Sequence, residues 1–124
     1  MKVMVVEDSA AMRGLIASVL GQISGCEVVE VGTGFEALRT LPRAGVDIIV
    51  TDINMPDING LELLAFIRRT PALASVPVLV VTSEGSDRDK EKALALGANA
   101  YLTKPFEAEN LLNAVRDLAP KAKK

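Results

Sequence analysis

Apolar segments of strand length alternate with segments of helical periodicity throughout this chain of 124 residues. We expect five strands, at about 2–6, 27–31, 47–51, 77–82 and 100–103. Four of them are nearly continuous apolar runs, which is typical of strands that helices cover on both faces. Regular alternation of strands and helices favours a parallel sheet in an α/β fold, and the length suits one domain over 1–124.

Helix start signals stand between the predicted strands. Ser9, Thr33, Asn59 and Ser86 are the expected N-caps, and Glu36 completes the spacing of a capping box with Thr33. The first helix has apolar residues at helical spacing, at Met12, Leu15, Ile16, Val19, Leu20 and Ile23. These signals support the same order of strands and helices.

The fourth helix differs from the others because residues 87–92 are all charged. Only Ala93, Leu94 and Leu96 remain for the core, and Gly97 is placed to end the helix. We expect a weakly anchored helix that moves at low energetic cost. An ordinary solvated face explains the same charges.

Polar and charged side chains stand at the ends of four predicted strands. Glu7 and Asp8 follow the first strand, Asp52 follows the third, Thr82 ends the fourth, and Lys104 follows the fifth. In a parallel sheet the carboxyl ends of the strands lie along one edge, where ligands bind. We therefore expect three carboxylates, a hydroxyl and an ammonium group in one site.

These groups suit phosphoryl transfer. Three neighbouring carboxylates need a cation, and Mg²⁺ commonly binds one or two carboxylates together with water and phosphate oxygens. Asp52 is a candidate nucleophile that becomes an aspartyl phosphate, while the metal, Lys104 and Thr82 stabilise the transferred group. Taken singly, each residue has a plainer explanation. Glu7 and Asp8 suit helix-dipole partners and Asp52 a turn former, while Thr82 suits an ordinary β-branched strand residue and Lys104 a solvated loop charge.

Composition argues against several other functions. A net charge of −2, from 14 basic and 16 acidic residues, gives no electrostatic basis for nucleic-acid binding. There is no histidine to act as a base, a metal ligand or a phosphate carrier. We expect no membrane insertion and no signal peptide, because no apolar run could cross a bilayer and Met1-Lys2 leads directly into a strand. The lone Cys26 suits a reducing cytoplasm.

Four motifs together are highly specific. They are Val5-Val6-Glu7-Asp8-Ser9, Thr51-Asp52-Ile53-Asn54-Met55-Pro56 with Gly60, Val81-Thr82-Ser83, and Tyr101-Leu102-Thr103-Lys104-Pro105-Phe106. With them the whole chain resembles the receiver domain of bacterial two-component response regulators, most closely the single-domain chemotaxis (CheY-like) type. The resemblance implies a single receiver domain over 1–124. Its expected fold is a doubly wound, flavodoxin-like three-layer sandwich with a five-stranded parallel sheet in the order 2-1-3-4-5.

The resemblance also implies roles for the site residues. Asp52 accepts a phosphoryl group from a phosphohistidine on a separate sensor histidine kinase. Asp8 and Asp52 bind Mg²⁺ directly, Glu7 acts largely through water, and the backbone carbonyl of Asn54 is a further ligand. Lys104 pairs with the phosphoryl group.

A switch is implied beyond the site. Thr82 moves toward the phosphate and Tyr101 turns inward, which remodels the face formed by the fourth helix, the fifth strand and the fifth helix. A cis peptide bond is expected between Lys104 and Pro105.

Two positions are implied to tune dephosphorylation. They are Asn54, two residues after Asp52, and Glu84, two residues after Thr82. This pair resembles the chemotaxis type and implies a short-lived signal. Residues 85–88 depart from the best-known chemotaxis proteins, which leaves the output partner open.

The leading interpretation is a monomeric cytoplasmic switch that binds a downstream target such as a flagellar motor component. It is expected not to be an enzyme, except toward its own phosphorylation and dephosphorylation. The alternative is a phosphorelay intermediate that passes the phosphoryl group to a histidine phosphotransfer protein. An aspartate-nucleophile phosphatase of the haloacid dehalogenase type is disfavoured because Asn54 stands where that family needs an Asp. A flavin or nucleotide binder is disfavoured because no Gly-rich phosphate loop follows the first strand.

Overall fold

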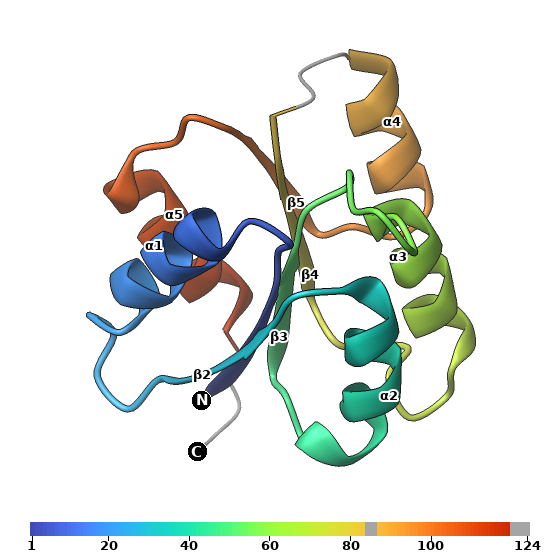
Figure 1. The fold of residues 1–124 in the computed structure, drawn as a ribbon, viewed down its shortest axis with the longest axis horizontal. Helices are drawn as coiled ribbons and strands as arrows, with labels where there is room; N and C mark the ends of the chain where they lie inside the picture. Colours follow the sequence, from blue (N-terminus) through green and yellow to red (C-terminus); the bar gives the residue numbers. More distant parts are fainter. Residues whose placement is uncertain (84–86, 120–124) are drawn as a thin grey trace.

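The computed structural model describes residues 1–83 and 87–119, and within them five parallel strands alternate with five helices (Figure 1). The strands are β1 (Lys2–Val6), β2 (Glu27–Val31), β3 (Ile48–Thr51), β4 (Val78–Thr82) and β5 (Ala100–Thr103). The helices are α1 (Ala10–Leu20), α2 (Gly34–Ala44), α3 (Gly60–Arg69), α4 (Asp87–Ala95) and α5 (Ala108–Leu118). The sheet order is β2-β1-β3-β4-β5, which confirms the expected topology. In this part of the chain no helix is long and apolar enough to cross a membrane.

Helices cover both faces of the sheet. α1 and α5 lie on one face, and α2, α3 and α4 lie on the other (Figure 1). Side chains along β1 alternate between the two layers: Val3 and Val5 pack with α1 and α5, while Met4 and Val6 pack with α2 and α3. This is the doubly wound three-layer sandwich that the sequence predicts.

Position in the sheet decides how completely each strand is buried. All of β3 and β4 is buried, and so is β1 beyond Lys2. Most residues of the edge strands β2 and β5 keep some exposure to solvent. The continuous apolar run of β5 therefore does not mean that both of its faces are fully covered.

The predicted N-caps lie where helices begin. The Ser9 hydroxyl accepts a hydrogen bond from the N–H of Met12, at 3.2 Å. Asn59 forms a complete capping box with Glu62, in which each side chain accepts from the other residue's N–H. Ser86 lies outside the described residues. An N-cap side chain of this kind stabilises a helix by roughly 1 kcal/mol compared with alanine.

Two details of the helices differ from expectation. The Thr33 hydroxyl caps α2 by accepting from the Glu36 N–H, but the Glu36 carboxylate accepts from the Gly32 N–H. The expected capping box is therefore only half formed. In α1 the apolar stripe is narrower than predicted, because Leu15 is 49% exposed.

Helix α4 is weakly anchored, as the sequence predicts. Ala93 is its buried residue, whereas Leu94 and Leu96 are 44% and 38% exposed. The expectation that these two leucines contribute to the core was therefore wrong. Gly97 follows the helix at a φ of 110°, and the N–H groups of Gly97 and Ala98 donate to carbonyls of the last turn.

Candidate functional site

Neighbouring strand ends bring the predicted site residues together. β1 and β3 end side by side, so Glu7 and Asp52, the first residues beyond them, are neighbours. β4 and β5 also end side by side, where the Lys104 N–H donates to the Thr82 carbonyl oxygen at 2.9 Å. Four strands thus contribute to one edge of the sheet, as predicted.

Glu7, Asp8 and Asp52 form an acidic cluster. One carboxylate oxygen of each lies within 4.8 Å of the other two. Glu7 and Asp52 are only 2% and 7% exposed, whereas Asp8 is open to solvent. Carboxylate oxygens so close together are the ligands that hard divalent cations prefer, so this donor set fits Mg²⁺.

Lys104 neutralises part of this charge. Its Nζ lies 2.8 Å from Glu7 Oε1 and 3.0 Å from Asp52 Oδ2. Burial lowers the pKa of the Lys104 ammonium, but the hydrogen bonds to Glu7 and Asp52 and the negative charges of these carboxylates together outweigh burial, so the pKa lies above its ordinary value. The side chain therefore stays charged at neutral pH. The peptide bond between Lys104 and Pro105 is cis, as expected.

Glu7 is the most buried acid of the cluster. Burial raises the pKa of its carboxyl group, and the hydrogen bonds from Lys104 and from the Ser9 N–H offset only part of that rise. The Ser9 N–H lies 3.1 Å from Glu7 Oε2. Arg13 donates to the Glu7 carbonyl oxygen at 2.8 Å, which fixes the backbone that carries both Glu7 and Asp8.

Gly60 lets the loop after β3 fold back against Asp52. A Cβ at this position would overlap the carbonyl oxygen of Asp52. The Gly60 N–H donates to the carbonyl oxygen of Ile53 at 2.7 Å and closes the loop. A glycine is therefore needed here for close approach of two backbone segments.

The remaining predicted residues differ in how far they are buried. Thr82 is completely buried at the end of β4. Tyr101 lies on β5, half-buried, and packs against the core layer of α2, α3 and α4. Asn54 is exposed, two residues after Asp52. Glu84 lies outside the described residues.

Asp57 is a residue whose contacts sequence analysis missed. Its carboxylate accepts hydrogen bonds from the N–H groups of Gly34 and Phe35, at 3.2 and 2.9 Å, and so caps α2 from the loop after β3. The N–H of Phe35, followed by that of Ile58, lowers the pKa of the Asp57 carboxyl group. No local signal reveals this cap, because the partners are 22 and 23 positions apart.

Known proteins share both the sequence pattern and the fold. The response regulator receiver domain family matches residues 3–116. Protein PilG of Pseudomonas aeruginosa is 37% identical over 120 residues, which are 97% of this chain and 88% of that protein. A chemotaxis protein CheY homolog of Campylobacter jejuni is 36% identical over 119 residues, which are 95% of this chain and 92% of that protein.

Solved structures of response regulators and receiver domains share this fold. The chemotaxis response regulator CheY4 of Vibrio cholerae is similar with a TM-score of 0.87 and 34% identity, over 94% of this chain and 97% of that chain. A signal receiver domain of a histidine kinase from Syntrophus aciditrophicus has a TM-score of 0.89 and 29% identity, over 99% of this chain and 92% of that chain. The chain therefore belongs to the response regulator receiver domain family, close to the chemotaxis type, and is a phosphorylation-activated signalling switch.

Proposed function

We propose that Asp52 receives the phosphoryl group, that a phosphohistidine of a sensor histidine kinase donates it, and that Mg²⁺ is required. The observation that carries this proposal is the convergence of Asp52 with Glu7, Asp8 and Lys104 at one edge of the sheet. Asp52 follows β3, the middle strand of the sheet in the described residues. Of the three acids in the cluster, Asp52 is the one that follows this middle strand.

The contacts of Asp52 suggest which oxygen reacts. Its Oδ1 accepts a hydrogen bond from the Ile53 N–H at 2.6 Å, while Oδ2 faces Lys104. Oδ2 attacks phosphorus as the P–N bond of the phosphohistidine breaks. Lys104 then donates to oxygens of the transferred group and offsets their charge. Thr82 donates a further hydrogen bond from the end of β4.

Asp8 and Asp52 would bind the magnesium ion directly and Glu7 largely through water, with the backbone carbonyl of Asn54 as the third protein ligand. The bound ion supplies positive charge that stabilises the phosphoryl group. Glu7 is fixed by Ser9 and Lys104, and Asp8 is the exposed member of the set. The loss of Asp8 should therefore affect metal binding with little effect on the core.

Phosphorylation changes the conformation of the face formed by α4, β5 and α5. A phosphoryl group adds roughly two negative charges and several strong acceptors, which draw the Thr82 hydroxyl toward it. Tyr101, whose β-sheet partner is Val80 of β4, then turns inward. Helix α4 follows at low cost because Ala93 is its buried residue.

The remodelled face binds a downstream target. That target is a flagellar motor component in the leading version and a histidine phosphotransfer protein in the alternative. The protein catalyses no reaction besides its own phosphorylation and dephosphorylation. Asn54 and Glu84 set how long the signal lasts.

Intact mass spectrometry tests the proposal. With Mg²⁺ and phosphoramidate, the mass of the wild-type protein should rise by one phosphoryl group. The gain should vanish when the metal is chelated, and also in Asp52→Asn. Full labelling under chelation would remove the magnesium requirement, and full labelling of Asp52→Asn would place the acceptor elsewhere.

A further inference from the structure

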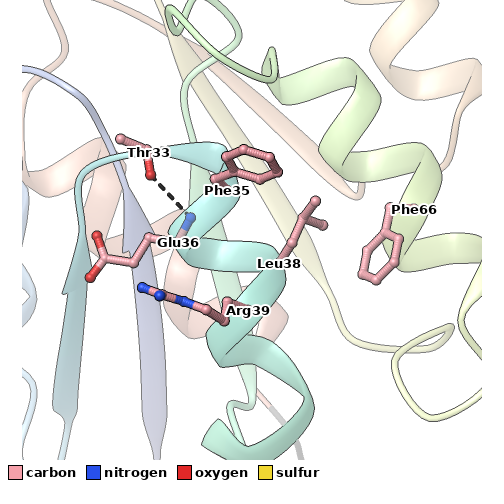
Figure 2. A pocket seen from close by; sticks show the side chains of 6 residues that line it. All are labelled: Thr33, Phe35, Glu36, Leu38, Arg39 and Phe66. Atoms are coloured by element: carbon pink, nitrogen blue, oxygen red, sulfur yellow. Dashed lines mark hydrogen bonds between the residues drawn. The ribbon is translucent and has the colours of Figure 1, made fainter.

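A groove between α2 and α3 lies apart from the acidic cluster. It has a volume of about 740 Å³, and the residues that line it are Thr33, Phe35, Glu36, Leu38, Arg39 and Phe66 (Figure 2). Phe35 is 68% exposed, more than any other large hydrophobic residue in the described chain. An aromatic ring left in water can gain substantial free energy when a partner buries it.

The apolar floor of the groove is held by the fold. Leu38 and Phe66 are half-buried and pack against the core layer of α2, α3 and α4. Figure 2 shows their side chains directed toward each other across the space between α2 and α3. Phe35 lies one turn before Leu38 on the same side of α2. Three apolar side chains therefore form one continuous patch.

The backbone of Phe35 is held in place before any partner binds. Its backbone N–H donates to the carboxylate of Asp57 at 2.9 Å, and the neighbouring Gly34 N–H donates to the same carboxylate. The first turn of α2 is thus tied to the loop after β3. A surface ordered before binding loses less conformational entropy when a partner arrives.

Two arginines lie at one end of the groove: Arg39, which lines it together with Glu36, and Arg43, which lies just beyond it. Arg39 lines the groove, and together with Thr40 and Arg43 it lines an adjoining depression of about 350 Å³. Both arginines are exposed, and neither forms an ion pair within residues 1–83 and 87–119. Glu36, the acid in the lining, has its carboxylate engaged by the Gly32 N–H.

We propose that this groove is a docking surface for an acidic amphipathic segment of a partner protein. Apolar side chains of that segment cover Phe35, Leu38 and Phe66, and its carboxylates pair with Arg39 and Arg43. Charge selects this occupant, because a basic segment would be repelled. A second copy in a two-fold contact would bring the same arginines together. The surface does not involve Asp52, so the proposal stands apart from the phosphorylation chemistry.

A displayed library of random peptides, panned against the unphosphorylated protein, tests the chemistry of the occupant. We expect enriched peptides that combine acidic and apolar residues, and amide shift changes centred on residues 33–43 and on Phe66. Enrichment of basic peptides, shifts centred elsewhere, or no enrichment at all would overturn the proposal. No phosphodonor is present, so failure here leaves the assignment of Asp52 untouched.

Fluorescence anisotropy with an enriched acidic peptide then tests the residues. Phe35→Ser and Arg39→Glu should each weaken binding by about tenfold or more. Leu15→Ser on α1 and Arg116→Glu on α5 are matched controls at exposed positions and should leave the affinity unchanged. Phe35 and Arg39 are exposed, so both variants should fold, which circular dichroism checks. Equal affinity in Phe35→Ser and wild type, or a wild-type dimer that Phe35→Ser dissociates, contradicts the assigned occupant.

Discussion

The Lys104 ammonium lies 3.0 Å from a carboxylate oxygen of Asp52, although 52 positions separate the two residues in the chain. The same nitrogen lies 2.8 Å from Glu7. One cation therefore offsets two buried carboxylates at the place where we propose that a metal ion and a phosphoryl group bind. Stability, metal affinity and signalling should each respond when this cation is removed.

Lys104→Ala should destabilise the metal-free protein by about 3 kcal/mol, because it leaves buried carboxylates without their cation. Mg²⁺ should bind more tightly than to wild type, since a competing positive charge is gone, and should restore part of the lost stability. Urea unfolding with and without Mg²⁺ measures both effects. Lys92→Ala, at an exposed position on α4, is the control. A metal-free stability equal to that of wild type would show that the ion pairs contribute nothing.

Asp8→Ala should weaken Mg²⁺ binding by roughly tenfold or more, or upward of ~1.4 kcal/mol. Asp8 is exposed and is proposed as a direct ligand, whereas Glu7 is proposed to act through water. Glu7→Gln should therefore weaken binding less than Asp8→Ala does. Isothermal titration calorimetry gives the affinities. If Asp8→Ala binds Mg²⁺ as well as wild type, the acids serve only as partners of the α1 dipole.

Gly60→Ala should destabilise the fold by about 1–3 kcal/mol, because the added methyl group overlaps the Asp52 carbonyl oxygen. It should also slow phosphorylation, since the loop that carries Asp52 must shift. Gly14→Ala in α1 is the matched control, because nothing lies within 4 Å of its added methyl group. That control should gain about 0.5–1 kcal/mol of stability. Urea unfolding of both variants is the measurement, and a neutral Gly60→Ala would contradict the close packing.

Asp57 should make stability depend on pH in the acid range. The hydrogen bond from the Phe35 N–H, and then that from Ile58, hold the folded-state pKa of Asp57 below its ordinary value of 3.8. The ionised Asp57 carboxylate therefore adds to the free energy of unfolding above pH 3.8, and this stabilisation is lost as the pH falls through the folded-state pKa. Asp57→Asn should show a smaller loss of stability between about pH 5 and pH 3 than wild type. An acid profile of Asp57→Asn identical to that of wild type would disprove the cap.

Parallel strands explain why the site was predictable from sequence. An apolar run fixes where a strand ends, and parallel pairing then brings the next residues to one edge. Glu7, Asp52 and Lys104 could therefore be grouped although they are far apart in the chain. The register of β1 with β3 and of β4 with β5 confirms that grouping.

Contacts between loops and helices were harder to predict from the sequence. Arg68 donates to the carbonyl oxygens of Val76 and Gly97, and Asp57 caps α2, yet neither residue stands out in a hydrophobic pattern. Such hydrogen bonds depend on how loops pack after the sheet has formed. The exposure of Leu94 in α4 and of Leu96 just after it was also missed, because an apolar residue type alone does not show which side of the helix packs against the core.

Chemical trapping of the phosphorylated residue tests the central claim most directly. Borohydride reduces an aspartyl phosphate to homoserine, which peptide mapping by mass spectrometry then locates in the chain. After treatment with Mg²⁺ and phosphoramidate, we predict homoserine at position 52 and at neither Asp8 nor Asp57. Homoserine at Asp8 or Asp57, or a labelled protein that yields no homoserine, would contradict the assignment of Asp52 as the phosphoryl acceptor.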